Sequence, residues 1–243
     1  MVGKPNERET SQMMKKVDMT ALLDCVRDAG APIGATYLSE VMNIPSATVG
    51  RMLRMAESEG YLTRISNKGR CLTEKGQEYL DCQETLDYKK ASADKLVGLM
   101  QDLTKEQLLG VMQVRKLLEG YTAELACANV SELEIAEMET ILLEYELEVR
   151  RGGLGNEPDL QFHLSIAKAT RNAILHQILK IILTTDNAYS QFSSVADTIQ
   201  NRKMCVDQHT EILNAIKDHD VARSKKAMET HLNKVISDIE QHY

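Results

Sequence analysis

The spacing of apolar residues in the first ninety positions predicts three helices followed by a hairpin. Apolar side chains recur every three or four residues, which places them on one face of a helix. These helices are expected over about 16–29, 35–42 and 46–59. Pro45 stands in the short turn before the third helix, and Gly60 ends that helix. Two helices joined across a three-residue turn are typical of a helix-turn-helix motif.

After Gly60 the pattern changes to that of strands. Two short runs, 61–65 and 70–72, flank a turn that contains Gly69, and together they predict a two-stranded hairpin. A further helix is expected from Thr73 to about Tyr88. This order of elements predicts a winged helix.

From residue 96 onward the apolar positions keep the helical spacing, and the sequence predicts no strand. Helices are expected over about 105–128, 131–150, 158–169, 172–198, 201–217 and 220–241. The fold class is therefore mainly α, with an N-terminal winged helix and a C-terminal all-helical bundle. The expected division is a flexible leader over 1–15, the winged helix over 16–88, a linker over 89–96 and the helical domain over 97–243.

Composition narrows the class of protein. Of 243 residues, 43% are hydrophobic and 27% are charged, which is ordinary for a globular protein with a packed core. The five cysteines form no CxxC pair, so neither a disulfide framework nor a thiolate zinc site is expected. No apolar run approaches the roughly 20 residues that span a bilayer. We therefore expect a cytoplasmic protein with no membrane partner.

The net charge of −7 is unevenly distributed. Residues 1–90 contain 13 basic and 13 acidic side chains, so the whole excess of negative charge lies in the remainder of the chain. A polyanion can therefore approach the N-terminal part without strong repulsion.

The outer face of the third predicted helix is small, polar and basic, and the hairpin carries further cations. Small polar side chains at the start of a recognition helix reach base edges, and flanking cations contact phosphates. The candidate DNA-binding residues are Ser46, Thr48, Arg51, Arg54, Arg64, Lys68 and Arg70. The alternative is that these are solvated surface charges on a module used for protein contacts.

The stretch TVGRMLRMAESEGYL resembles the winged helices of bacterial GntR and IclR regulators. It departs from GntR usage before the second helix, where Gly34-Ala35-Thr36-Tyr37 replaces the usual Pro-Ser-Glu-Arg run. The resemblance therefore implies double-stranded DNA as a partner but not a particular operator.

Four residues in the C-terminal part form a candidate metal site. Asp159 and His163 are spaced i, i+4, so a carboxylate and an imidazole share one helix face. His209 and His231 lie in two later helices. Three imidazole nitrogens and one carboxylate oxygen suit Zn²⁺, Ni²⁺ or a related divalent ion. Taken singly, each histidine is more simply explained as capping, pairing or facing solvent.

The segments DLQFHLSIAKATRN and DQHTEILNAIKDHDVARSKKAMETHL resemble the effector-binding FCD domain of the FadR subfamily of GntR regulators. The resemblance covers about residues 97–240. It implies that an Asp and three His hold a metal inside an all-α bundle, and that the metal and a nearby Arg hold a small carboxylate. The four ligand positions are occupied by Asp159, His163, His209 and His231.

Three further residues are candidate effector contacts. Arg115 matches the arginine of the family's first long helix, and its planar fork suits a carboxylate; the alternative is a salt bridge with Glu119. Asn172 either caps the next helix or lines the cavity, and capping is favoured. Arg202 is either a second anion contact or a member of an ordinary ion pair.

These observations predict a DNA-binding transcription regulator, a repressor or an activator, whose operator affinity is controlled by a small carboxylate at a divalent-metal site. A homodimer is expected, because one winged helix makes too few contacts for a specific site. The first alternative is a metal-responsive regulator without an organic effector. A metal-dependent hydrolase is disfavoured, because no Glu or His general base stands out near the ligands and the DNA-binding module would have no purpose.

Overall fold

The computed structural model describes residues 19–184 and 199–242, which fall into two compact units, Met1–Ala93 and Asp94–Tyr243. The expected leader over 1–15 lies outside the described residues. So does the 185–198 part of the helix expected over 172–198.

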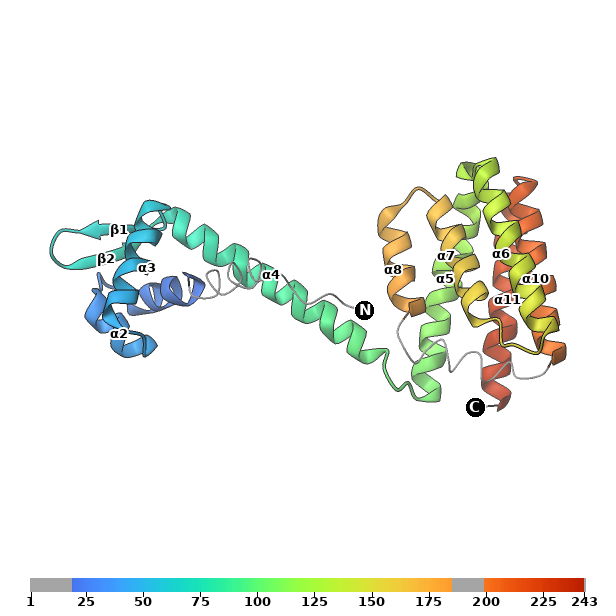
Figure 1. Cartoon of the computed structure of the whole chain (residues 1–243), viewed down its shortest axis with the longest axis horizontal. Coiled ribbons are helices and arrows are strands. Elements are labelled where there is room, and N and C mark those ends of the chain that lie inside the picture. The colour runs from blue at the N-terminus through green and yellow to red at the C-terminus, as the bar shows by residue number, and fades with distance from the viewer. Residues whose placement is uncertain (1–18, 185–198, 243) are drawn as a thin grey trace. The chain divides into compact units, whose positions relative to one another are not determined.

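The N-terminal unit has the predicted order of elements (Figure 1). A helix over 19–29 is followed by α2 (Ala35–Met42), α3 (Ser46–Ser58), β1 (Leu62–Ile65), β2 (Gly69–Leu72) and α4 (Glu74–Leu99). The turn after α2 begins at Asn43, whose left-handed backbone ends that helix. The core of the unit consists of fully buried aliphatic side chains, including Leu22, Leu38, Leu53 and Leu80. The predicted winged helix-turn-helix is confirmed.

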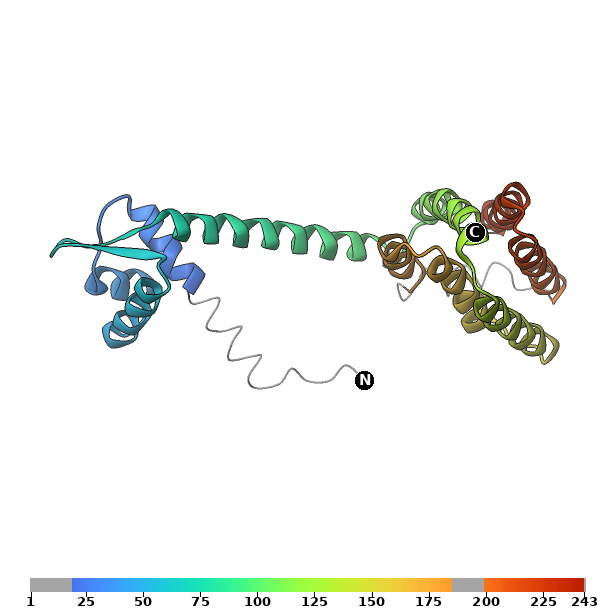
Figure 2. The ribbon, with the colours of Figure 1, turned by 90° about the horizontal axis from the view of Figure 1, so that it is seen from above.

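The wing is a two-stranded antiparallel hairpin with one additional bridge. β1 pairs with β2 from Leu62↔Leu72 to Ile65↔Gly69, and Ile33 forms an isolated bridge with Arg70. Gly69 has a φ of +126°, and a side chain there would overlap the backbone of Ile33. Glycine is therefore required where the hairpin meets the segment before α2. In Figures 1 and 2 the hairpin projects beyond the helices of its unit.

Helix α4 is longer than expected. It continues through the predicted linker over 89–96 and ends at Leu99, so the polar segment is helical and the division between the units falls inside this helix. The segment lacks proline, and its Lys, Ala and Leu residues favour helix. Its polarity reflects exposure to solvent rather than irregular backbone.

The C-terminal unit is all-helical among the residues that the structure describes (Figure 1). Its helices are α5 (Lys105–Asn129), α6 (Glu132–Arg150), α7 (Asn156–Ala169), α8 (Ala173–Thr184), α10 (Ile199–Lys217) and α11 (Val221–His242). Capping boxes begin α5 at Thr104 and α6 at Ser131. Helix α5 packs along α11, and α10 packs against both α11 and α6. Helix α7 packs against α6 and α5. The predicted helical bundle is confirmed.

Across residues 19–184 and 199–242, no helix combines the length and the apolar character that crossing a bilayer requires.

Candidate functional site

The four predicted metal ligands come together inside the C-terminal bundle. Helix α7 supplies Asp159 and His163, α10 supplies His209 and α11 supplies His231. One ligand atom from each residue can be chosen so that all four lie within 4.8 Å of one another. The three imidazoles are buried, and the carboxylate of Asp159 is partly exposed.

The separations between ligand atoms suit a single ion. Nε2 of His209 lies 3.2 Å from Nε2 of His231 and 3.4 Å from Oδ1 of Asp159. Nε2 of His163 lies 4.0 Å from Oδ2 of Asp159. Ligands about 2.0–2.1 Å from a tetrahedral ion are separated by about 3.4 Å. Among the described residues, Nε2 of His163 forms no hydrogen bond, so this buried nitrogen near Asp159 is available to an ion; the Nδ1 atoms of His163 and His209 also form none. The residues therefore could hold a divalent metal.

The surroundings keep two of the imidazoles neutral, which is the form that binds metal. Burial lowers the pKa of both His209 and His231 well below the usual value, and the neighbouring imidazoles lower each pKa further. A metal ligand must offer a lone pair. Both histidines are therefore neutral near pH 7 and can bind an ion without first releasing a proton.

Residues around the centre orient the ligands. Oε1 of Gln208 lies 3.1 Å from Nδ1 of His231, so Nε2 of that ring faces the other ligands. The buried Tyr145 hydrogen-bonds Asp159, and its pKa is raised by burial and then by the Asp159 carboxylate.

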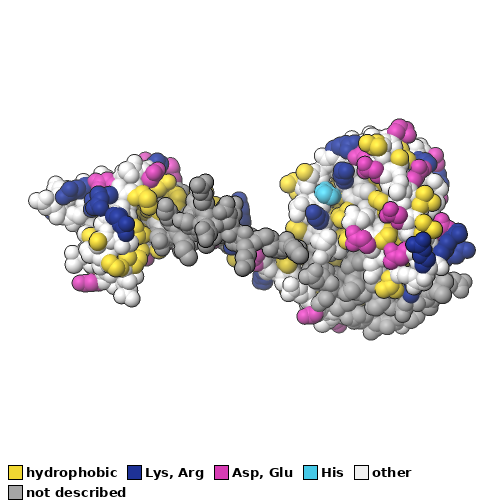
Figure 3. Space-filling model, in the orientation of Figure 1, with side chains coloured by type: hydrophobic (Ala, Val, Ile, Leu, Met, Phe, Trp, Pro, Cys, Tyr) yellow, Lys and Arg dark blue, Asp and Glu magenta, His cyan; other side chains and the backbone are white. Residues whose placement is uncertain are grey.

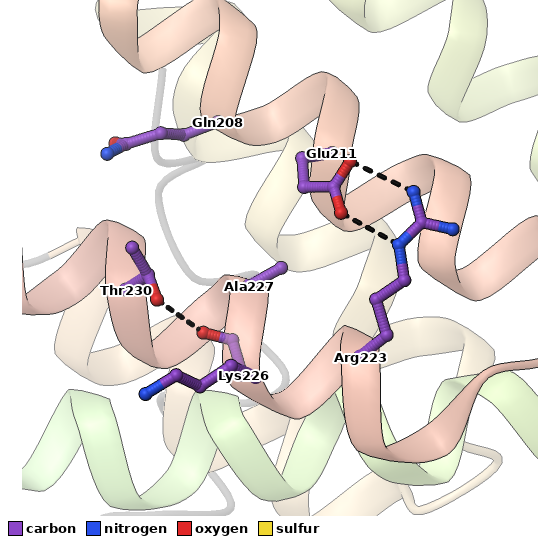
Figure 4. Close-up of a pocket in the computed structure, with 6 residues that line it drawn as sticks. All are labelled: Gln208, Glu211, Arg223, Lys226, Ala227 and Thr230. Atoms are coloured by element: carbon purple, nitrogen blue, oxygen red, sulfur yellow. Dashed lines mark hydrogen bonds and ion pairs between the residues drawn. The ribbon is translucent and has the colours of Figure 1, made fainter.

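Gln208 also lines a surface pocket of about 230 Å³ between α10 and α11, where Arg223 forms a two-bond ion pair with Glu211 (Figure 4).

Arg115 lies in the interior of the bundle, paired with Glu119. Its Nε lies 2.6 Å from Oε1 of Glu119, and each side chain is at least 96% buried. The other oxygen of Glu119 contacts Nδ1 of His163. The salt bridge between Arg115 and Glu119, which was the alternative role for Arg115, is therefore present. It is buried and lies beside His163, one of the candidate ligands.

The two other candidate effector contacts have structural partners. Oδ1 of Asn172 accepts the backbone N–H of Leu175 at 3.1 Å, so the exposed Asn172 caps α8, as favoured from the sequence. Nη1 of Arg202 donates to the carbonyl oxygens of Gly152 and Gly153 at 3.2 and 3.0 Å. These contacts fix the glycine-rich loop before α7, a role that the sequence did not suggest.

Most candidate DNA-binding residues are exposed on α3 and the hairpin. Ser46, Arg51 and Arg54 are exposed on α3, and Thr48 is half-buried beside Arg51. Arg64 and Lys68 are exposed on the hairpin. Figure 3 shows Lys and Arg side chains gathered on this face of the N-terminal unit.

Arg70 differs from the other predicted DNA contacts. Its guanidinium is paired with Glu57 of α3 at 3.0 Å, and its backbone bridges to Ile33. Arg70 therefore ties the hairpin to α3, and its contact with DNA stays a prediction.

The sequence did not indicate a role for three residues that lie near the candidate ligands. These are Tyr145, Gln208 and Glu119, the last as a partner of His163. Periodicity predicts that Glu119 is buried, but not that it contacts His163. Residues 108, 112, 115, 119, 122 and 126 share one face of α5, and all are buried, so the helical spacing already places Glu119 inside. Nothing in the spacing of Tyr145 or Gln208 indicates a role.

Comparisons with known proteins agree with the architecture. The FCD domain family matches residues 110–234, which is more than half of the chain. The HTH-type transcriptional repressor NanR of Edwardsiella tarda is 27% identical over 194 residues, covering 74% of this chain and 75% of that protein. The Uxu operon transcriptional regulator of Escherichia coli is 32% identical over 130 residues, covering 51% of each chain.

Solved structures show the same fold. Streptococcus agalactiae GntR aligns with a TM-score of 0.50 at 20% identity, covering 92% of this chain and 99% of its own. E. coli McbR/YncC aligns with a TM-score of 0.53 at 15% identity, covering 95% and 97%. The family and these relatives are transcription regulators, not enzymes. The chain belongs to the GntR superfamily of DNA-binding transcription regulators, in the branch whose C-terminal domain is an FCD domain.

Proposed function

We propose that this regulator binds its operator with an affinity that is controlled by a small carboxylate held at a divalent-metal site in the C-terminal unit. The observation that carries the proposal is the convergence of Asp159, His163, His209 and His231 from three helices within 4.8 Å. Zn²⁺ and Ni²⁺ are the ions that best suit three imidazoles and one carboxylate.

The residues around the centre suit an anionic effector. The bound ion would supply a Lewis acid, and an increase in its coordination number beyond the four protein ligands would admit a carboxylate oxygen. Arg115 is a buried cation that pairs with Glu119, and Glu119 in turn contacts His163. Because a planar guanidinium can bind two carboxylates through different N–H groups, Arg115 is the proposed anion contact of the protein itself, with Glu119 kept at Nε. Asn172 and Arg202 act through helix capping and through the glycine-rich loop.

In the N-terminal unit, the start of α3 is the proposed base-reading element. Exposed Ser46 and Arg51 can reach base edges and phosphates, while Lys68 on the wing can contact the backbone beyond the groove. The arrangement of α2, α3 and the hairpin supports this role. A regulator that meets the chromosome in this way acts in the bacterial cytoplasm.

We further propose a homodimer that forms through α5 and α8. Helix α5 exposes Val114, Leu117 and Tyr121 on one face, and α8, packed beside it, exposes Ile174 and Ile178. Leu117 and Ile174 are 75% and 72% exposed, which is costly for large aliphatic side chains in a monomer. An apolar pocket of about 470 Å³ is lined by α5, α8, the end of α4 and the segment between α4 and α5. A second copy is the partner that a two-half-site operator requires.

The experiment compares wild-type protein with His209→Ala and with the control His176→Ala, which alters a histidine outside the centre. The operator is obtained by selecting bound fragments from a random DNA pool with wild-type protein. Metal content is measured by elemental mass spectrometry and DNA affinity by fluorescence anisotropy. Small molecules that co-purify are identified by native mass spectrometry.

The expected result is that His209→Ala loses the metal and the response to the co-purifying carboxylate while retaining basal DNA binding. His176→Ala should keep both. Unchanged metal content in His209→Ala would overturn the metal site. A response to added metal alone, with no organic ligand, would replace the carboxylate with the ion as the signal.

A further inference from the structure

Glu119 is a buried carboxylate that contacts two functional groups at once. It lies on α5 with 1% of its surface exposed, and its two oxygens have different partners. We propose that Glu119 is a positioning residue that fixes the metal ligand His163 and the anion contact Arg115 together. The inference rests on the proposed function, because it assigns Glu119 a role at the same site.

On one side, Glu119 sets the orientation of His163. Oε2 of Glu119 contacts Nδ1 of the imidazole, and Nε2 on the opposite edge of the ring is directed toward Asp159. A carboxylate that accepts the Nδ1 proton leaves the Nε2 lone pair available to an ion. The contact therefore selects the tautomer that ligation requires.

On the other side, Glu119 holds Arg115. Nε of Arg115 donates to Oε1 at 2.6 Å, and the two residues lie one helical turn apart on α5. The Nη1 atom of Arg115 approaches the sulfur of Met112 at 3.8 Å. The guanidinium is thus fixed by residues of its own helix, while His163 belongs to α7.

The charges explain why a carboxylate is stable in this interior. Nε of Arg115 lies 2.6 Å from Oε1 of Glu119, so each of these two buried groups is the counter-charge of the other. Removing the carboxylate would leave the Arg115 charge buried without this counter-charge.

The amide that replaces the carboxylate in Glu119→Gln has one oxygen and one NH₂ group. Arginine has no acceptor, so the amide oxygen must face Arg115, and the NH₂ group then faces His163. That group donates to Nδ1 and moves the imidazole proton to Nε2, the atom that would ligate the ion. The substitution should therefore oppose metal binding although it changes no ligand.

The first test measures affinity for Zn²⁺, and in parallel for Ni²⁺, by competition with a chromophoric chelator. Glu119→Gln should bind 10- to 100-fold more weakly than wild type, the range typical of lost outer partners of ligands. The control is Glu124→Gln on the same helix, whose partner is Lys225 on the surface; it should match wild type. Equal affinities for wild type and Glu119→Gln would overturn the inference. If wild type itself binds neither ion, the proposed metal site fails, which is a different result.

The second test distinguishes positioning from loss of structure. Arg115→Met frees the amide of Glu119→Gln to turn its oxygen toward His163, so adding Arg115→Met should raise metal affinity more in the Glu119→Gln background than in wild type. The double variant removes both buried charges together. If Glu119→Gln alone does not fold, the double variant is compared with Arg115→Met, and the two should bind metal with similar affinity. Thermal unfolding of each metal-free variant records the fold. Strictly additive effects on metal affinity would overturn the sharing of one carboxylate.

Discussion

The ring of Tyr145 occupies the space that a side chain at Gly155 would need. Gly155 has a φ of +74° and stands at the N-terminus of α7, immediately before the turn that carries Asp159. Tyr145 in turn hydrogen-bonds Asp159. The glycine therefore makes room for the tyrosine beside Asp159, one of the four proposed ligands.

Gly155→Ala should destabilise the C-terminal unit and weaken metal binding together. The new methyl group must displace the Tyr145 ring, and the left-handed backbone adds strain, so a loss of about 1–3 kcal/mol is expected. Chemical denaturation of the metal-free protein and a metal titration measure the two effects.

The matched control is Gly152→Ala. Gly152 also has a positive φ, of +85°, but open space surrounds the position of a Cβ there. This variant should show only the backbone cost, about 1 kcal/mol, with metal affinity unchanged. Equal metal affinities in the two variants would contradict the role of Tyr145.

Acid should remove the stability contributed by Glu134. This residue closes the capping box of α6 and pairs with Arg171, and the bonds from Arg171 lower its pKa to about 2. Because the folded pKa lies below the unfolded value of about 4.3, the contribution is complete at neutral pH. It is lost as the pH falls from about 4.3 toward 2.

Glu134→Gln should therefore cost roughly 1–3 kcal/mol at pH 7, and the difference from wild type should shrink at pH 3. Urea denaturation at several pH values measures it. Glu137→Gln, whose carboxylate is exposed and 3.9 Å from Lys168, is the control and should cost little at any pH. A difference that stays constant between pH 7 and pH 3 would rule out the ion pair as its source.

Leu117→Glu should convert the proposed dimer to a monomer, because it places a charge in the exposed apolar face of α5 and α8. Leu133→Glu alters a side chain of similar exposure, 70%, on α6 and should leave the oligomer intact. Analytical ultracentrifugation gives the masses. The α5 and α8 surface is wrong if both variants remain dimeric or both dissociate.

Lys68→Ala should weaken DNA binding without affecting the fold. Loss of one phosphate contact lowers the slope of log affinity against log salt by about 0.9. Arg70→Ala should instead lower the melting temperature of the N-terminal unit, because it removes the ion pair with Glu57. Anisotropy at several salt concentrations, with thermal unfolding of each variant, separates the two roles. An unchanged slope for Lys68→Ala would place the wing away from the phosphates.

Much of the fold follows from local signals in the sequence. Pro45 and Gly60 bound α3, and Gly69 allows the hairpin to meet Ile33, so glycine, proline and apolar spacing predict the elements from α2 to β2 to within about a residue, but not the length of α4. The i, i+4 spacing of Asp159 and His163 likewise places two of the proposed ligands on one face of α7. These features depend on neighbours along the chain.

The surroundings of the ligands depend on neighbours in space instead. The contact between Glu119 and His163 exists because α5 packs against α7, and Tyr145 reaches Asp159 because α6 packs there as well. Arg202 binds the carbonyl groups of a loop that lies some fifty residues earlier in the chain. Charge and periodicity in one segment contain no information about such partners.

Because the proposed ligands lie on α7, α10 and α11, a bound metal would also affect the lifetime of the protein in the cell. An ion that binds the folded chain alone adds about 2.7 kcal/mol of stability when its concentration is 100 times the dissociation constant. Starvation for that ion would enlarge the unfolded fraction that proteases degrade. The amount of regulator in the cell, and not only its affinity for DNA, would then follow the supply of metal.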